Sequence, residues 1–169
     1  LQASGATVAT HSSGNHGAAL ALAARLLGKR CVVVVPEGAS LPKVAAIEAY
    51  GATLIRCAPT ATARAAGLAR VVEEYDATPI HPYDDPHVIA GQGTATLELL
   101  SERPELDVII VPIGGGGLFG GTAIAAHGHD PRIEVYAAEP AGADDAYRAF
   151  ASGVHDTDFV PNTIADGLR

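Results

Sequence analysis

The stretch VIIVPIGGGGLFGG, residues 108–121, joins a run of aliphatic residues directly to four consecutive glycines. The apolar run predicts a buried strand, and residues 117–127 predict the helix that follows it. Glycine has no Cβ, so a row of glycines lets another group come very close to the backbone, at a cost in conformational entropy. The stretch therefore indicates an α/β fold, and it raises the question of which group comes that close.

The same alternation of apolar runs and helix-period segments continues along the whole chain. Strands are expected at residues 6–11, 31–36, 52–57, 77–81, 107–113 and 133–139. Helices are expected at residues 17–28, 42–51, 61–76, 87–103, 117–127 and 143–151. Parallel strands need long connections, and their buried runs need covering. We therefore expect open, twisted parallel sheets with helices on both faces.

The loop IHPYDDPHV, residues 80–88, carries two prolines and two aspartates and predicts a lobe boundary. We accordingly expect a small α/β lobe at 1–86 and part of a large α/β lobe at 87–169. The chain starts without Met and ends at TIADGLR with no helix stop signal. We expect both ends to be cuts through a longer protein.

Composition narrows the class of function. The 19 acidic residues outnumber the 11 basic ones, the formal net charge is −8, and no Lys/Arg cluster occurs, which argues against nucleic-acid or membrane-surface partners. The first residues lack the charged n-region and the continuous apolar h-region typical of a signal peptide, and no apolar run reaches membrane-spanning length. Cys31 and Cys57 each lie at one end of an expected strand, which suits reduced thiols in the cytoplasm. A small-molecule partner is favoured.

The loop HSSGNHG, residues 11–17, follows the first expected strand and begins a helix. Unpaired backbone N–H groups and the helix dipole make such a position suitable for an anion such as a substrate carboxylate. The alternative is an ordinary helix cap, which needs only one of Ser12, Ser13 or Asn15.

The glycine run after the fifth expected strand admits three interpretations. Gly115, Gly117 and Gly120 satisfy the G-x-G-x-x-G pattern, and Glu139 follows about twenty residues later, as in dinucleotide-binding domains. Four successive amides without side chains could instead form a nest for a phosphate monoester. A flexible turn without a ligand is the third interpretation.

The segment EPAGADD, residues 139–145, places carboxylates around the start of the last expected helix. Such oxygen ligands suit a hard divalent cation. The alternative is that Asp144 and Asp145 are acidic residues favoured by the helix dipole. The histidines at 87, 127, 129 and 155 are scattered, and we expect them to be solvated surface residues.

Three motifs in order carry a resemblance to a known family: SSGNHG, then GQGT (91–94) with VPIGGGGL, then YAAEPAGADDAY. Together they resemble the pyridoxal-phosphate-dependent serine/threonine dehydratase and serine racemase family, which has fold type II, the tryptophan synthase β-like fold. The resemblance spans roughly residues 8–169. It implies an ammonia-lyase that converts L-serine or L-threonine to a 2-oxo acid and ammonia, with serine racemase activity as a second implied reaction.

The resemblance also implies roles for individual residues. The phosphate of the cofactor would be held by Gly114, Gly115, Gly116, Gly117 and the Leu118 amide. The substrate carboxylate would be held by Ser12, Ser13, Gly14 and His16. Asn15 would bind the cofactor's ring hydroxyl, and Ser13 would donate or accept a proton in racemisation. Mg²⁺, Ca²⁺ or Mn²⁺ would be bound by Glu139, Ala143 and Asp145.

Two parts of the family pattern lie outside this sequence. The Schiff-base lysine is expected upstream of SSGNHG in a Ser-x-Lys motif, which neither Lys29 nor Lys43 matches, and the partner of the pyridine nitrogen is expected beyond Arg169. We therefore expect this chain alone to be inactive. Separately, we expect the full-length protein to be a homodimer or homotetramer. The alternatives are a cysteine synthase-like enzyme of the same fold, a dinucleotide-binding domain, and a non-catalytic phosphate-binding module.

Overall fold

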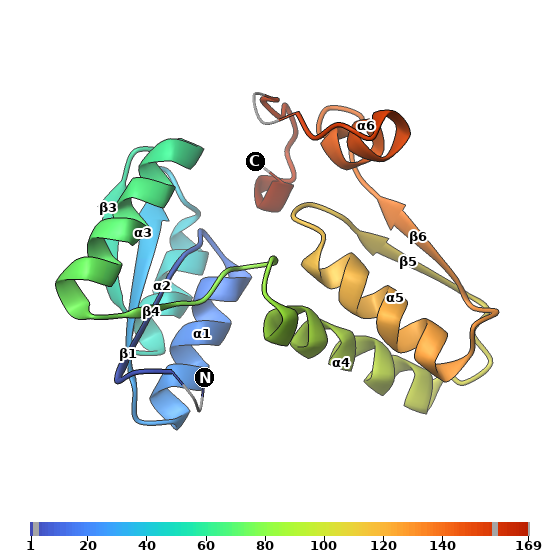
Figure 1. Cartoon of the computed structure of the whole chain (residues 1–169), viewed down its shortest axis with the longest axis horizontal. Helices are drawn as coiled ribbons and strands as arrows, with labels where there is room; N and C mark the ends of the chain where they lie inside the picture. Colours follow the sequence, from blue (N-terminus) through green and yellow to red (C-terminus); the bar gives the residue numbers. More distant parts are fainter. Residues whose placement is uncertain (2–3, 157–158, 169) are drawn as a thin grey trace. The chain divides into compact units, whose positions relative to one another are not determined.

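The computed structural model describes residues 1, 4–156 and 159–168, and it divides the chain into two compact units. Unit 1 is Leu1–Pro82 and unit 2 is Tyr83–Arg169 (Figure 1). The change of unit falls inside the proline-containing loop at 80–88. Within the described residues, no helix is long and apolar enough to cross a membrane.

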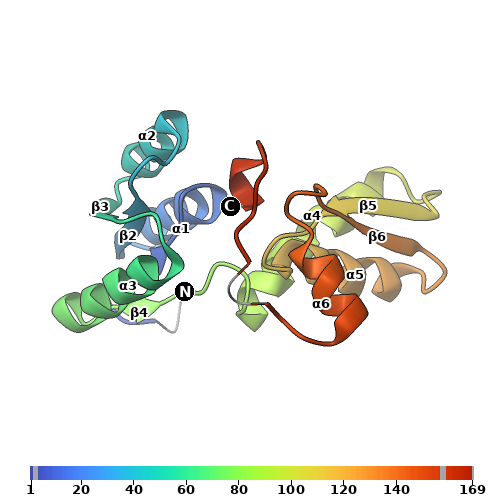
Figure 2. The same ribbon diagram turned by 90° about the horizontal axis from the view of Figure 1, so that it is seen from above.

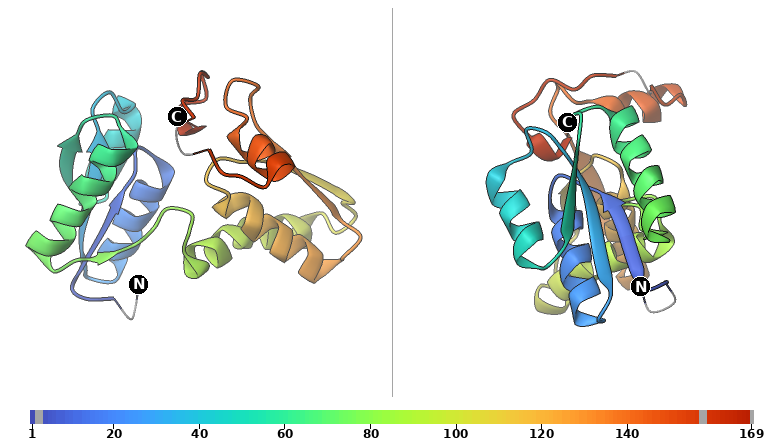
Figure 3. Two further views of the ribbon diagram at one scale, coloured as in Figure 1. Left: turned by 45° about the horizontal axis from the view of Figure 1, so that its top comes forward. Right: turned by 90° about the vertical axis from the view of Figure 1, so that its left-hand side faces the viewer.

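Unit 1 is a parallel four-stranded sheet covered by three helices. Its strands lie in the order β3-β2-β1-β4 and are β1 (Thr7–His11), β2 (Arg30–Pro36), β3 (Thr53–Cys57) and β4 (Thr78–Pro79). Its helices are α1 (Asn15–Leu26), α2 (Leu41–Ala49) and α3 (Ala61–Tyr75). Figure 2 shows α2 and α3 on opposite sides of the strands, and the right-hand view of Figure 3 shows α1 and α3 placed likewise.

The valine run of β2 explains why unit 1 needs helices on both faces. Val33 and Val35 pack with Ile47 of α2 in one core cluster, whereas Val32 and Val34 pack in a second cluster on the other face. All four valines are fully buried. Side chains alternate between the faces of a strand, so an uninterrupted apolar run can be buried only in a sheet covered on both sides. The expected doubly covered parallel sheet is confirmed for this unit.

Unit 2 is built on two parallel strands, β5 (Val108–Pro112) and β6 (Glu134–Ala138), paired in register from Val108 with Glu134 to Pro112 with Ala138. Its helices are α4 (Pro86–Glu102), α5 (Gly117–His129) and α6 (Asp145–Ser152), with a 3-10 turn η1 (Asp166–Leu168). The core of the unit forms between the helices and one face of the strands, and it consists of Leu100, Ile109, Ala126 and Ile133.

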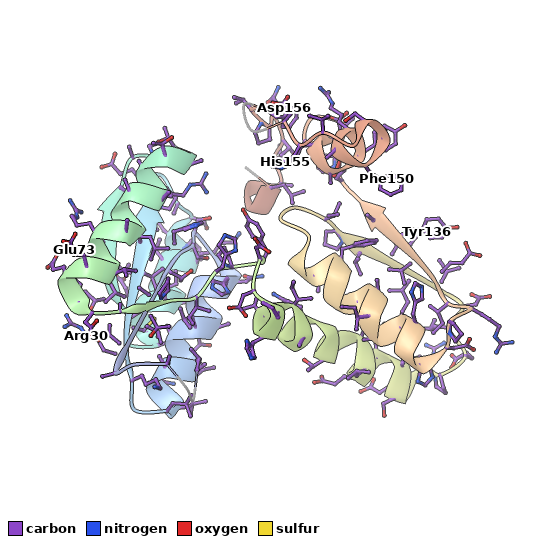
Figure 4. The ribbon with its side chains drawn as sticks, viewed as in Figure 1. Arg30, Glu73, Tyr136, Phe150, His155 and Asp156 are labelled. Atoms are coloured by element: carbon purple, nitrogen blue, oxygen red, sulfur yellow. The ribbon has the colours of Figure 1, made fainter. Side chains whose placement is uncertain are left out.

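Helices were expected on both faces of each sheet, but the second face of β5 and β6 is exposed in the structure. Ile110 is 67% exposed and its paired neighbour Tyr136 is 51% exposed. Tyr136 points away from α5, and Phe150 of α6 also points outward (Figure 4). Within the described residues, helices α4 and α5 therefore cover a single face of this sheet.

Helices α4 and α5 lie side by side in unit 2, and glycines allow their close approach (Figure 1). A Cβ added at Gly93 would lie 2.7 Å from the carbonyl oxygen of Gly121, and a Cβ at Gly121 would overlap with the Ile89 carbonyl oxygen. Two larger residues at these positions would force the helices apart. This contact fixes α5, whose first turn follows the glycine run.

Candidate functional site

The loop of unit 1 between β1 and α1 contains the expected carboxylate-binding residues. Its Ser12 amide donates to the Val34 carbonyl at 3.0 Å, which ties the loop to β2. The Ser12 hydroxyl accepts hydrogen bonds from the amides of Gly14 at 3.2 Å and Gly17 at 3.0 Å. Ser12 thus caps α1, while its own hydroxyl proton can still be donated to an anion. The two interpretations of this loop, cap and anion site, are compatible.

Lys43 brings a positive charge to the same loop. A Cβ added at Gly14 would lie 3.2 Å from Cδ of Lys43 and 3.6 Å from its Nζ. The lysine belongs to α2, whereas Gly14 is the N-cap of α1. Lys43 does not lie in a Ser-x-Lys motif, so the sequence does not mark it as a site residue. The packing of α2 beside α1 brings its ammonium group to the loop.

Histidines gather near the carboxyl ends of β1 and β4. The rings of His11 and His81 meet edge to face with centroids 6.0 Å apart, and His16 Nε2 lies 3.3 Å from the Ile80 carbonyl oxygen. Burial lowers the pKa of His11, and the positive charges of His81, Arg64 and His16 lower it further. These histidines come from two segments, residues 11–16 and residue 81, which the pairing of β1 with β4 brings together.

In unit 2 the glycine run forms the turn from β5 into α5. Gly116 is the N-cap of α5, at φ +85°, and no side chain among the described residues caps this helix. A φ of this sign is strained for residues with a Cβ, so position 116 requires glycine for conformational reasons. The first amides of α5 have no acceptor within the helix. The turn therefore presents backbone donors and the positive end of the helix dipole.

Neighbouring side chains lie directly on the other glycines. A Cβ at Gly115 would overlap with the ring of Tyr83, and one at Gly117 would lie 3.0 Å from both Cα and Cβ of that tyrosine. A Cβ at Gly114 would lie 2.7 Å from Cδ2 of Leu168. The groups that approach this backbone in the structure thus belong to Tyr83 and Leu168 of the same unit.

The acidic segment lies between β6 and α6. Glu139 Oε1 accepts a hydrogen bond from the Tyr147 amide at 3.0 Å, and its Oε2 is buried without a hydrogen-bond partner among the described residues. Asp144 Oδ1 lies 2.8 Å from Arg148 Nε, an i,i+4 ion pair. Asp144 is therefore engaged with arginine, while the buried Glu139 oxygen is the group that a cation would satisfy.

The remaining expected metal ligands lie within the same turn. Ala143 is 2% exposed and donates its amide to the Pro140 carbonyl at 2.8 Å, and Asp145 is the first residue of α6. No cluster of three or more His, Cys, Asp or Glu side chains suited to a metal occurs in the described part of the chain. The expected ligand set, with two carboxylates and one carbonyl, is a smaller group than such a cluster.

Both cysteines are free thiols. Burial raises the pKa of Cys31 to about 11 and also raises the pKa of Cys57. Neither thiol is therefore an activated nucleophile.

The chain is similar in sequence to known proteins. Residues 1–169 match the family described as "Pyridoxal-phosphate dependent enzyme". The serine racemase of Dictyostelium discoideum is 52% identical over 163 residues, which are 95% of this chain and 50% of that protein. The beta-hydroxyaspartate dehydratase of Paracoccus denitrificans (strain Pd 1222) is 45% identical over 161 residues, 95% of this chain and 51% of that protein.

The chain is also similar in structure to a solved protein. The structure of maize serine racemase superposes with a TM-score of 0.92 at 48% identity, covering 99% of this chain and 51% of that one. The chain thus spans about half the length of the relatives that it matches. The expected fold type II architecture is confirmed, and the chain belongs to the pyridoxal-phosphate dependent enzyme family.

Proposed function

We propose that the protein containing this chain is a pyridoxal-phosphate-dependent ammonia-lyase acting on L-serine or L-threonine, with serine racemisation as a second activity. The observation that carries this proposal is the identity of 45–52% to proteins named serine racemase and beta-hydroxyaspartate dehydratase. These names describe reactions at the Cα of small amino acids. We further propose a cytoplasmic homodimer or homotetramer.

The start of α5 suits the cofactor's phosphate. The helix begins after a glycine N-cap without a side-chain acceptor, so its first amides are available to phosphate oxygens. We assign the phosphate to Gly114, Gly115, Gly116, Gly117 and the Leu118 amide. Bound in the protein, pyridoxal phosphate supplies an electron sink that acidifies the substrate's Cα–H bond.

The loop of unit 1 is proposed to orient the amino acid. Ser12, Ser13, Gly14 and His16 would bind its carboxylate at the N-terminus of α1, and Asn15 would bind the cofactor's ring hydroxyl. The Lys43 ammonium beside Gly14 adds attraction for that carboxylate. Holding the carboxylate fixes which bond at Cα is broken.

Ser13 distinguishes the two activities. A hydroxyl on the face of Cα opposite the lysine base can return a proton there, which inverts the configuration. We therefore expect Ser13→Ala to abolish D-serine formation while leaving dehydration largely intact. Equal loss of both activities would instead assign Ser13 to carboxylate binding alone.

For the acidic segment we propose a divalent cation bound by Glu139, the Ala143 carbonyl and Asp145. The Oε2 of Glu139, which is buried and has no hydrogen-bond partner in the described part of the chain, supports this assignment. Such an ion would join the end of β6 to the first turn of α6 and stabilise the segment.

The decisive experiment compares two samples: this chain, and a protein as long as its relatives. Each is incubated with pyridoxal phosphate and reduced with borohydride, and the modified lysines are located by mass spectrometry. We expect one specific lysine outside this chain to be labelled, and 2-oxo acid to form from L-serine or L-threonine. Absence of specific labelling in the longer protein would refute the proposal. Saturable NADH binding, followed by fluorescence, would then favour the dinucleotide interpretation.

A further inference from the structure

The four glycines at 114–117 differ in their backbone conformation and in the groups that lie next to them. Gly116 has a positive φ and open space around it. Gly114 faces Leu168, whereas Gly115 and Gly117 both face Tyr83. Each position therefore has a reason for glycine that lies within the protein, independent of any ligand.

Tyr83 lies just before α4, whose first turn is capped by a side chain. Asp85 caps that helix by accepting hydrogen bonds from the amides of His87 at 2.8 Å and Val88 at 3.1 Å, and Pro86 occupies its first position. Asp85 stays ionised for this role, because these hydrogen bonds lower its pKa. Tyr83 lies two residues before this cap, and its ring lies on the Gly115 backbone.

The atoms of Tyr83 nearest Gly115 belong to its ring, whereas those nearest Gly117 are its Cα, Cβ and carbonyl oxygen. The atoms nearest a Cβ at 115 are Cγ, Cδ1 and Cδ2 of Tyr83. The atoms nearest a Cβ at 117 include Cα of Tyr83 at 3.0 Å and its carbonyl oxygen at 3.1 Å. Shortening the side chain would thus relieve the first contact and leave the second.

We propose that Tyr83 is a positioning residue for the phosphate loop: its ring, packed on Gly115, fixes the backbone in the conformation that presents the amides at the start of α5. This inference rests on the proposed function, in which those amides bind the cofactor's phosphate. A loop held in its binding conformation before the ligand arrives loses less entropy on binding. The glycine at 115 is then a requirement of the tyrosine ring rather than of the phosphate.

The test is a double-mutant cycle in the protein at the full length of its relatives. The variants are Gly115→Ala, Tyr83→Ala and their combination, with Tyr83→Phe retaining the ring. The two readouts are the thermal midpoint without cofactor and the affinity for pyridoxal phosphate from an absorbance titration. Residues in contact show coupling in such cycles, whereas independent residues behave additively.

We expect Gly115→Ala alone to lower the thermal midpoint and to weaken cofactor binding by about tenfold or more, a plausible size for one misplaced contact. Adding Tyr83→Ala should restore most of the thermal midpoint and part of the affinity, because the methyl group then occupies space left by the ring. Tyr83→Phe retains the ring, so adding it to Gly115→Ala should give no rescue.

Gly117→Ala is the matched control. Its Cβ meets the backbone of residue 83, so Tyr83→Ala should not rescue it. If Gly115→Ala is equally damaging with and without the tyrosine ring, the inference is overturned while the proposed function stands. If the wild-type protein binds no pyridoxal phosphate, the proposed function is overturned, and the thermal cycle still decides whether ring and loop are coupled.

Discussion

The hydroxyl of Thr96 on α4 donates a buried hydrogen bond of 3.1 Å to the hydroxyl of Thr122 on α5. Both residues are almost fully buried, at 4% and 1% exposure. Thr96 lies about one helical turn after Gly93, and Thr122 directly follows Gly121. The pair is thus a polar link inside an otherwise close-packed helix interface. Its two members depend on each other for hydrogen bonding.

Replacing one member of this pair should cost more than replacing both. Thr122→Val leaves the Thr96 hydroxyl buried without this partner, and we expect a loss of about 1–3 kcal/mol in the free energy of unfolding. The double variant Thr96→Val/Thr122→Val removes both polar groups and should be closer to wild type. Urea denaturation measures both values. Additive losses would show that the two hydroxyls are not coupled.

Two glycines of α4 should respond to alanine in opposite directions. Gly93→Ala directs a methyl group at the Gly121 carbonyl oxygen, and overpacking of this kind costs about 1–3 kcal/mol. Gly91 lies in the same helix with nothing within 4 Å of its added Cβ, so Gly91→Ala should stabilise by about 0.5–1 kcal/mol. Thermal denaturation of both variants provides the comparison. Similar effects at the two positions would refute the close contact.

The histidine cluster of unit 1 should make stability depend on pH. The pKa of His11 is lowered in the folded state by burial, then by His81, Arg64 and His16, so the unfolded chain binds this proton more readily. Stability should therefore fall as the pH drops through the unfolded value of about 6.5. His11→Gln should flatten the pH dependence of the thermal midpoint between about pH 5 and 7.

His155→Gln is the matched control for this pH dependence. His155 is exposed on the segment after α6 (Figure 4). Its replacement should leave the pH profile unchanged. A profile equally altered by both variants would show that the effect does not come from the cluster.

The proposed cation site should be visible as stabilisation by divalent ions. A ligand that binds only the folded state at a hundred times its Kd stabilises by about 2.7 kcal/mol. Glu139→Gln keeps an oxygen for the Tyr147 amide but removes the negative charge, so the increase in thermal midpoint with Mg²⁺, Ca²⁺ or Mn²⁺ should largely disappear. Glu98→Gln, on the exposed face of α4, should retain it. An unchanged response in Glu139→Gln would exclude this site.

Replacing each of the two adjacent serines of the unit 1 loop by alanine should affect the free energy of unfolding differently. Ser12 accepts the Gly14 and Gly17 amides, so Ser12→Ala should cost about 0.5–2 kcal/mol of stability, as loss of a helix cap does. Ser13→Ala should leave the free energy of unfolding close to wild type. Denaturant titration of the two variants checks this, and equal destabilisation would argue against Ser12 as the specific cap.

Much of the fold could be predicted from local patterns. The apolar run CVVVVP is buried as β2, and the expected start of a helix at residue 117 coincides with that of α5. These predictions succeed because strand burial and helix periodicity are properties of neighbouring residues. The strand expected at 77–81 is shorter in the structure, Thr78–Pro79, because it pairs with β1 over these two residues.

Some features of the candidate site could likewise be predicted from the sequence, and others could not. The sequence alone determined that the glycine run follows a buried strand and begins a helix, because aliphatic clustering and glycine are readable over a few positions. Only the tertiary structure decided that Tyr83 lies on Gly115, that Lys43 lies beside Gly14, and that one face of β5 and β6 is uncovered by the described residues. The physical reason is that a contact between distant segments depends on how whole elements pack, and the spacing of residues along the chain carries no record of that packing.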